Sequence, residues 1–262
     1  MLLVIDVGNT HTVLGVYEDS QLRNDWRIHT ERDTTEDEFN VLINSLFAAD
    51  NLFLRKVDQT IISCVVPPMM TILDAFCRKY LGHPPQWVDA QNCAGMPILL
   101  KNPAEVGADR IVNAVAAFHK YRTSLIIVDF GTATTFDAIS LKGEYLGGAI
   151  SPGIGIASEA LFIKASKLPR VEIFVPPSNV IGKDTISSIK SGIIFGYAGL
   201  VDGIVRRMQL EMATGPKVIA TGGLAELLFD VSETIEAVEP ALTLEGLRLI
   251  AQQDSFQKTD VR

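Results

Sequence analysis

Two short motifs that combine an aspartate with a glycine stand at corresponding places in the chain. Residues 2–10 read LLVIDVGNT and residues 125–133 read LIIVDFGTA, so an apolar run ends at Asp6 in the first motif and at Asp129 in the second. A tight turn with glycine lets backbone N–H groups approach an anion closely, and neighbouring Thr or Asn side chains add donors. A carboxylate repels a phosphate unless a cation lies between them. Each motif therefore predicts a site for a phosphate together with a metal ion.

The alternative is that each Asp-x-Gly motif only closes a β-hairpin, which is the usual explanation for a single copy of so short a motif. Two copies, each following a buried strand at the start of a repeated set of strands, favour phosphate and metal binding instead. In the first copy, Asp6 with Gly8, Asn9 and Thr10 is suited to a nucleotide phosphate and a water-coordinated Mg²⁺. The second copy offers the same groups through Asp129 and the threonines that follow it.

A third group of polar residues lies in EVGADRIVN, residues 105–113. Asp109 and Arg110 stand at the start of a predicted helix, where free N–H groups favour an anion and the guanidinium can bind a carboxylate or a phosphate. A helix cap with a weak surface ion pair is the simpler interpretation of this segment by itself.

The elements that position these motifs form an α/β pattern. After each aspartate the sequence predicts two further strands, at 12–17 and 22–28 in the first half and at 134–140 and 145–150 in the second. Thr35-x-x-Glu38 is a capping box that begins a helix, and apolar spacing predicts a second helix after Pro67-Pro68, a third beginning near 106, and others over 155–167, 185–212 and 243–253. The apolar residues of the second helix are Met70, Leu73, Phe76 and Cys77. Strands at 60–66 and 217–220 complete two similar halves.

Composition excludes several classes of protein. The chain has 262 residues with 31 Asp+Glu against 23 Lys+Arg, which argues against a nucleic-acid surface. Apolar stretches free of charged residues are too short to predict a membrane span, and the start MLLVID is not typical of a signal peptide, so we expect a cytoplasmic protein. The three cysteines and four histidines lack zinc-site spacing, and the P-loop motif is absent.

The motifs together resemble those of the type III pantothenate kinases. The matching segments are DVGNT at 6–10, NPAEVGADRIVNA at 102–114, DFGTATTFD at 129–137, GGAISPG at 147–153, KLPR at 167–170, TGGLAEL at 221–227 and LTLEGL at 242–247. The resemblance spans nearly the whole chain. It implies two duplicated ribonuclease-H-like domains of the actin-like and sugar-kinase superfamily, at 1–120 and 121–262, with mixed sheets flanked by helices and a nucleotide cleft between them.

The resemblance also implies a reaction. Members of this family transfer the γ-phosphoryl group of ATP to pantothenate, giving 4'-phosphopantothenate in the first step of coenzyme A biosynthesis, and work as homodimers with Mg²⁺ and a monovalent cation, K⁺ or NH₄⁺. A non-catalytic transcription accessory protein on the same scaffold is the chief alternative. A different small-molecule kinase and a dinucleotide oxidoreductase are the others.

Individual roles follow from the resemblance in the same way. ATP is expected at Asp6, Val7, Gly8, Asn9, Thr10, His11, Thr12, Val13 and Thr132, and pantothenate at Leu100, Gly107, Ala108, Asp109, Arg110 and Thr185. Asp109 is the expected catalytic base, acting as an ordinary ionised carboxylate. Asp129 is the expected ligand of the monovalent cation, and Asp6 is expected to hold Mg²⁺ through water. Two positions depart from the family pattern, since Leu100 replaces a usual tyrosine and His11 a common asparagine.

Overall fold

The chain folds into two compact units of α/β structure. The computed structural model describes residues 1–93, 95–173 and 175–259. Unit 1 comprises residues 1–96, 101–116 and the segment from 242 on, and unit 2 comprises residues 97–100 and 117–241. The division therefore falls inside a helix, after Ala116, and it groups the last helix with unit 1, whereas the expected boundaries were 1–120 and 121–262.

Unit 1 is built on a five-stranded mixed sheet in the order β3-β2-β1-β4-β5. Strand β1 pairs antiparallel with β2 and parallel with β4. The strands are β1 (Leu2–Val7), β2 (His11–Glu18), β3 (Gln21–His29), β4 (Gln59–Cys64) and β5 (Gln86–Trp87). The helices are α1 (Glu36–Ala49), α2 (Pro67–Phe76), the first part of α3 (Ala108–Tyr121) and α7 (Leu242–Thr259), with short turns η1 (Leu54–Lys56), η2 (Cys77–Leu81) and η3 (Pro103–Glu105).

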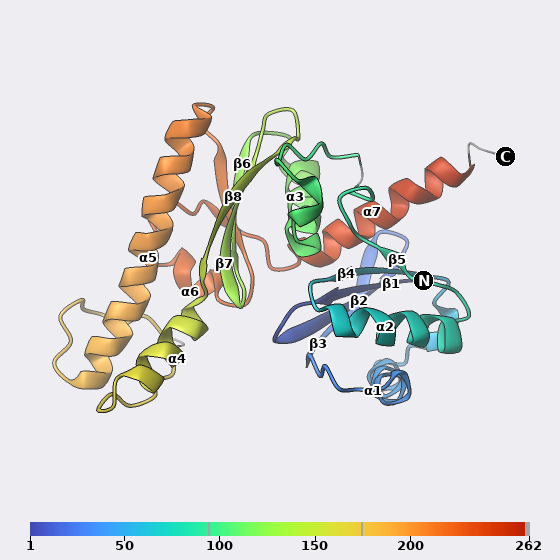
Figure 1. Cartoon of the computed structure of the whole chain (residues 1–262), viewed down its shortest axis with the longest axis horizontal. Coiled ribbons are helices and arrows are strands. Elements are labelled where there is room, and N and C mark those ends of the chain that lie inside the picture. Colours follow the sequence, from blue (N-terminus) through green and yellow to red (C-terminus); the bar gives the residue numbers. More distant parts are fainter. Residues whose placement is uncertain (94, 174, 260–262) are drawn as a thin grey trace. The chain divides into compact units, whose positions relative to one another are not determined.

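Helices cover both faces of this sheet (Figure 1). Apolar side chains of α1 and α2 pack with Leu3, Ile5 and Val7 of β1 to form the core on one face. Helix α7 lies against the other face, where Leu244 packs over Gly15 of β2. A side chain at Gly15 would lie 3.2 Å from the Leu244 Cδ1 atom, so the glycine makes room for the helix.

Unit 2 repeats this plan. Its sheet has the order β10-β9-β6-β7-β8, and β6 pairs antiparallel with β7 and parallel with β9, as β1 does with β2 and β4. The strands are β6 (Leu125–Phe130), β7 (Ala133–Ile139), β8 (Tyr145–Pro152), β9 (Lys217–Thr221) and β10 (Ala237–Val238), and the helices are α4 (Ile154–Lys164), α5 (Thr185–Met212) and α6 (Ala225–Phe229). The equivalent strand order in both units confirms the predicted duplication and the α/β class.

The predicted elements are found with small differences. The capping box is present, because the Thr35 side chain accepts from the Glu38 backbone N–H and the Glu38 carboxylate accepts from that of Thr35. The predicted apolar face of α2 was wrong at Met70, whose side chain is exposed, while Met69 is buried. Met69 and Leu73 are four residues apart and share the face that contacts the sheet.

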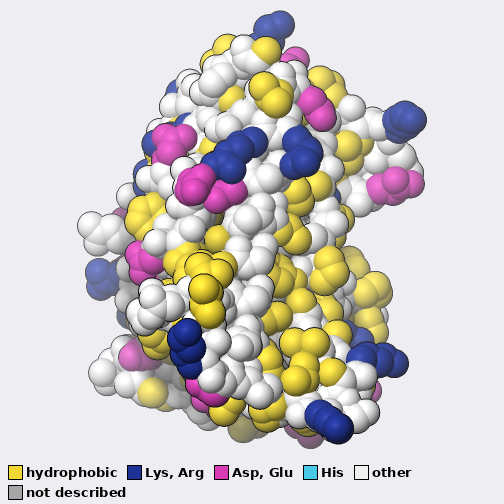
Figure 2. Space-filling model, turned by 90° about the vertical axis from the view of Figure 1, so that its left-hand side faces the viewer, with side chains coloured by type: hydrophobic (Ala, Val, Ile, Leu, Met, Phe, Trp, Pro, Cys, Tyr) yellow, Lys and Arg dark blue, Asp and Glu magenta, His cyan; other side chains and the backbone are white. Residues whose placement is uncertain are grey.

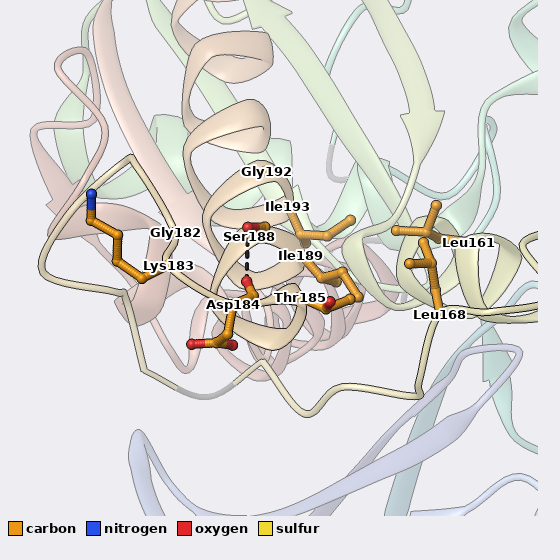
Figure 3. Close-up of a pocket in the computed structure, with 10 residues that line it drawn as sticks. All are labelled: Leu161, Leu168, Gly182, Lys183, Asp184, Thr185, Ser188, Ile189, Gly192 and Ile193. Carbon is orange, nitrogen blue, oxygen red and sulfur yellow. Dashed lines mark hydrogen bonds between the residues drawn. The ribbon is translucent and has the colours of Figure 1, made fainter.

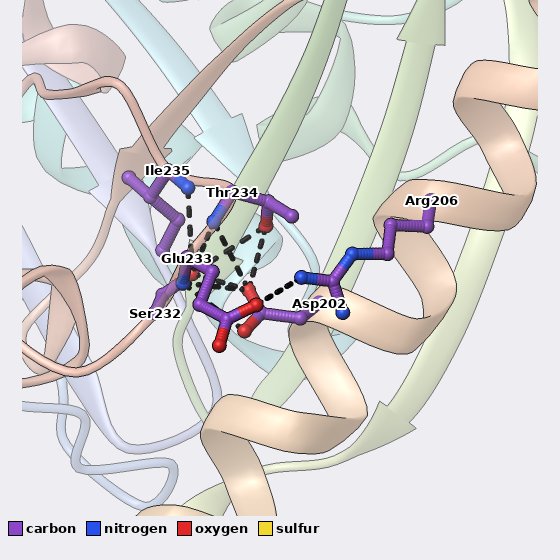
Figure 4. Close-up of polar contacts among 6 residues, drawn as sticks. All are labelled: Asp202, Arg206, Ser232, Glu233, Thr234 and Ile235. Atoms are coloured by element: carbon purple, nitrogen blue, oxygen red, sulfur yellow. Dashed lines mark hydrogen bonds and ion pairs between the residues drawn. The ribbon is translucent and has the colours of Figure 1, made fainter.

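A buried carboxylate joins α5 to the segment between α6 and β10 (Figure 4). The Asp202 Oδ1 atom accepts hydrogen bonds from the Ser232 hydroxyl at 2.6 Å and from the Thr234 hydroxyl at 2.8 Å, and its Oδ2 atom accepts from the Glu233 backbone N–H at 3.0 Å. Burial by itself would raise the pKa of Asp202, but these hydrogen bonds outweigh it and hold that pKa below its usual value. The ionised carboxylate therefore stabilises this part of unit 2.

One helix within the described residues, α5, is long and apolar enough to cross a membrane by length and composition alone. Its 28 residues include an 18-residue window with a mean hydropathy of 1.3, although charged residues such as Lys190 and Asp202 interrupt the helix. Within the protein, 44% of that window is buried, and α5 contributes Ile194, Val201 and Val205 to the core of unit 2. Core helices of globular proteins have the same length and composition.

Candidate active site

The first Asp-x-Gly motif forms the turn between β1 and β2 in unit 1. The Gly8 N–H donates to the His11 carbonyl at 3.0 Å, which closes the turn. The Thr30 hydroxyl donates to the Gly8 carbonyl at 2.7 Å and lies 2.9 Å from the Thr12 hydroxyl, so the residue that follows β3 supports the turn. Asn9, Thr10 and His11 remain exposed at its tip. The turn therefore presents polar groups outward from a braced backbone.

His11 stacks on His29 across β2 and β3, with ring centroids 5.2 Å apart. Burial lowers the pKa of His11 below its usual value, and the nearby charges of Arg27 and His29 lower it further. The ring is therefore neutral at pH 7. It can offer a hydrogen bond to a phosphate but not a positive charge.

The segment around Asp109 begins α3, also in unit 1. The Gly107 carbonyl accepts from the N–H groups of Arg110 and Ile111, at 3.1 and 3.2 Å, so Gly107 precedes the first turn and Asp109 lies within it. The Asp109 Oδ1 atom accepts from the Arg110 backbone N–H at 2.8 Å. A Cβ atom at Gly107 would lie only 2.5 Å from the same oxygen. The glycine is therefore required for the observed position of the carboxylate.

Asp109 differs from the ordinary ionised carboxylate that we expected, because its pKa is raised. Burial raises the pKa of Asp109, and it outweighs the opposing effects of the Arg110 backbone N–H and the Arg110 charge. The residue as a whole is partly exposed, but its carboxylate is enclosed. A raised pKa makes this carboxylate a stronger proton acceptor than a surface aspartate.

The second Asp-x-Gly motif forms the equivalent turn between β6 and β7 in unit 2. The Gly131 N–H donates to the Ala133 carbonyl at 3.1 Å. Two glycines from distant segments approach this turn. A Cβ atom at Gly222, whose φ is +92°, would lie 2.5 Å from Asp129 Oδ1, and one at Gly153 would lie 2.2 Å from the Thr132 carbonyl oxygen. The turn thus joins the ends of β8 and β9, and side chains are excluded at both contacts.

Gly153 and Gly222 are neighbours of the site that the sequence analysis did not assign. Both stand in segments that carry the family resemblance, SPG and TGG, and this was the available signal. Their close approach to Asp129 and Thr132 depends on the pairing of β7 with β8 and of β6 with β9. Such pairing between distant segments is not evident from local sequence.

Thr185 lies elsewhere in unit 2, at the first turn of α5, beside a pocket of about 690 Å³. In Figure 3, Leu161 and Leu168 point toward Ile189 and Ile193, while Lys183 and Asp184 point away from this apolar group. The pocket is lined by Leu161, Leu168, Gly182, Lys183, Asp184, Thr185, Ser188, Ile189, Gly192 and Ile193. It combines an apolar wall with hydroxyl groups.

Unit 2 does not bring Thr185 to the Asp129 turn. Helix α4 begins next to Thr132, because the Gly153 N–H donates to the Thr132 carbonyl at 3.1 Å. The pocket beside Thr185 includes Leu161, which lies two turns further along α4 and so about 10 Å away at 1.5 Å per residue. Leu100 is also in unit 2, where its Cδ2 atom would lie 3.3 Å from a Cβ at Gly147 of β8.

The residues around the two aspartates suit hard cations with oxygen ligands. No group of three or more His, Cys, Asp and Glu side chains that could hold a metal ion is found in the described part of the chain. Mg²⁺ does not need such a group, since it commonly uses one carboxylate, several waters and substrate phosphates. Next to Asp6 on the neighbouring strand, the fully buried Ser63 hydroxyl has no hydrogen-bond partner, which provides a further unused oxygen. The residues present therefore fit a hydrated Mg²⁺ at Asp6.

Comparisons with known proteins agree on one family. The model of the family described as "Type III pantothenate kinase" matches residues 2–207. A curated type III pantothenate kinase from Desulfatibacillum aliphaticivorans is 68% identical over 250 residues, covering 95% of this chain and 97% of that protein.

Solved structures show the same fold at low identity. A putative 2-dehydro-3-deoxygalactonokinase from Sinorhizobium meliloti has a TM-score of 0.57 at 12% identity, covering 96% of this chain and 98% of that one. A putative Baf family transcriptional activator from Campylobacter jejuni has a TM-score of 0.55 at 17% identity, covering 97% and 99%. These two likenesses bear on the fold alone. The family match over most of the chain and the 68% identity to a curated member show that this protein belongs to the type III pantothenate kinase family.

Proposed function

We propose that this chain transfers the γ-phosphoryl group of ATP to pantothenate, forming 4'-phosphopantothenate for coenzyme A synthesis. The observation that carries the proposal is the pair of equivalent Asp-x-Gly turns in a chain of this family. Each turn follows the strand that pairs antiparallel with one neighbour and parallel with the other. Phosphoryl transfer needs positioning and charge neutralisation rather than covalent catalysis, and two such turns can supply both.

In this proposal the turn over residues 6–13 binds the phosphates of ATP. Its glycine allows close approach of the backbone, and its exposed Asn9, Thr10 and His11 provide hydrogen-bond donors. Asp6 holds Mg²⁺ through water, and the ion, when bound, would neutralise the charge of the phosphates. Thr132 in the second turn contributes a further ATP contact.

Asp129 is proposed as the ligand of the monovalent cation, K⁺ or NH₄⁺. Its carboxylate ends a strand beside threonine hydroxyls and backbone carbonyls, and such oxygen-rich surroundings suit a large monovalent ion. Gly222 packs against Asp129 Oδ1 and the Phe130 backbone so closely that no side chain fits there, which holds the carboxylate in place. The cation, when bound, would offset phosphate charge.

Asp109 is proposed as the catalytic base. It orients the pantothenate hydroxyl and accepts its proton at a carboxylate oxygen as the phosphoryl group is transferred. The Arg110 backbone N–H holds Oδ1 at 2.8 Å, which fixes the direction of the carboxylate. Gly107, Ala108 and Arg110 line the same substrate site, and the Arg110 guanidinium can bind the pantothenate carboxylate. Leu100 provides an apolar contact where the family usually has tyrosine.

A homodimer is proposed through the outer face of α4 and α5. Figure 2 shows hydrophobic side chains gathered on this face, and the exposed ones include Ile156, Phe162, Ile163, Val180, Ile181 and Ile186. Gly192, Gly196 and Gly199 lie exposed along α5 with no atom near their Cβ positions, so another helix could approach closely there. Burying such a patch against a second copy removes apolar area from water. Thr185 at its edge would then serve as a substrate contact at the interface. The dimer is proposed to be cytoplasmic.

Purified protein incubated with ATP, Mg²⁺, K⁺ and pantothenate tests the proposal. We expect release of ADP that depends on pantothenate, with 4'-phosphopantothenate identified by mass spectrometry. Omission of pantothenate controls for ATP hydrolysis, and sugars in its place test the alternative of another small-molecule kinase. ATP binding without any pantothenate-dependent ADP would contradict the proposal, and a non-catalytic protein would behave in this way.

A further inference from the structure

Ser63 is a fully buried residue whose hydroxyl has no hydrogen-bond partner. It lies on β4, where the parallel pairing with β1 places it directly beside Asp6. Neighbouring strands are about 4.8 Å apart, and paired residues in a sheet direct their side chains to the same face. A buried hydroxyl without a partner is unfavourable unless something binds it. The hydroxyl that needs a partner thus shares a sheet face with Asp6.

Unit 2 contains the matching position and shows a different use of it. Strand β9 pairs with β6 as β4 pairs with β1, and Thr221 lies beside Asp129 in that register. The Thr221 hydroxyl donates to the Glu239 carbonyl at 2.8 Å, so it is satisfied within the protein. Both halves therefore place a buried hydroxyl next to the aspartate of the turn. In unit 2 the backbone uses it, whereas the hydroxyl of Ser63 remains available.

We infer that Ser63 positions the hydrated Mg²⁺ at Asp6, an assignment that rests on the proposed function. Its hydroxyl is closed to solvent and has no acceptor in this structure, so its role is to donate a hydrogen bond to the Asp6 carboxylate when that carboxylate turns to hold the waters of the Mg²⁺ shell. Groups that hold metal-bound waters and ligands in this way commonly contribute to metal affinity without contacting the ion. Ser63 is thus a positioning residue rather than a catalytic one.

The experiment compares Ser63→Ala with the unaltered protein by equilibrium binding of a fluorescent ADP analogue, with K⁺ present and with either Mg²⁺ or EDTA. We expect the affinity gained from Mg²⁺ to fall by about three- to tenfold in Ser63→Ala, which corresponds to one hydrogen bond, while binding in EDTA is unchanged. Thermal unfolding should show equal or greater stability, because the variant removes a hydroxyl that has no partner. A purely structural serine would instead lose stability.

Two further variants serve as controls. Thr60→Val removes a buried hydroxyl from the same strand, but Thr60 pairs with Leu3 and faces the other side of the sheet. The nucleotide affinity that this variant gains from Mg²⁺ should match that of the unaltered protein. Ser63→Thr keeps the hydroxyl, as Thr221 does in unit 2, and should restore the gain from Mg²⁺. An unchanged gain in Ser63→Ala, or a loss of stability in it, overturns the role of Ser63. Failure of the unaltered protein to bind the nucleotide overturns the proposed function as well.

Discussion

Replacement of Gly107 by alanine should displace the Asp109 carboxylate while leaving the fold intact. The new Cβ would lie 2.5 Å from Asp109 Oδ1, whereas its next neighbours, Asp109 Cγ and Arg110 Cδ, lie at ordinary contact distances of 3.7 and 3.8 Å. The carboxylate is the movable partner, so it must retreat by at least 0.5 Å to reach the 3.0 Å that Cβ contacts require. This movement strains or breaks its 2.8 Å hydrogen bond from the Arg110 N–H.

The expected effect is a loss in turnover of about ten- to a hundredfold, since a misplacement of about 1 Å in a reacting group can cost 10²-fold. The loss corresponds to about 1.4–2.7 kcal/mol in the barrier. Stability should change little, because Gly107 has no left-handed φ and the entropy that alanine removes from the unfolded chain offsets the weakened hydrogen bond.

A coupled assay of ADP release over a range of pantothenate and ATP concentrations would measure kcat and both KM values. Val41→Ala is a control for an alanine substitution, because Val41 is an exposed residue of α1. In an Asp109→Asn background the Gly107→Ala change should add little further loss, since both act on one group. Turnover within twofold of the unaltered protein, or fully additive losses in the double variant, would refute the reasoning.

Asp109→Asn itself should lower kcat by about 10²–10⁴-fold with little change in ATP affinity. Because burial raises the pKa of Asp109, the acid limb of the kcat/KM profile of the unaltered enzyme should lie above the usual aspartate range near pH 4. Asp129→Asn should abolish activation by K⁺; full K⁺-dependent turnover in this variant would argue against the cation site. Asp202→Asn should destabilise the protein by about 1–3 kcal/mol at pH 7. Since the pKa of Asp202 is lowered on folding, its ionised carboxylate stabilises the protein fully above about pH 4, and this stabilisation is lost as the pH falls through the folded-state pKa. The difference in stability between Asp202→Asn and the unaltered protein, measured by thermal unfolding, should therefore shrink in acid. Sedimentation should give a dimer, and Gly196→Glu, which adds a charge to the exposed face of α5, should shift it toward a monomer near 28.5 kDa with unit 2 still folded.

The sequence by itself was sufficient for the features that depend on neighbouring residues. The two turns follow from apolar runs that end in Asp-x-Gly, and the start of α1 follows from Thr35 and Glu38, because a turn or a cap is formed within a few residues. The repeat of the first turn in the second half predicted the duplicated sheets. The motifs and their order along nearly the whole chain were enough to recognise the family.

Only the tertiary structure decided which distant residues lie together. Ser63 stands beside Asp6, and Gly222 against Asp129, because parallel strands pair in one register, and local sequence does not specify that register. Helix α7 joins unit 1 although it follows the whole of unit 2 in the chain. The raised pKa of Asp109 has the same origin, since the burial that outweighs the helix start and Arg110 exists only once the surrounding elements have packed.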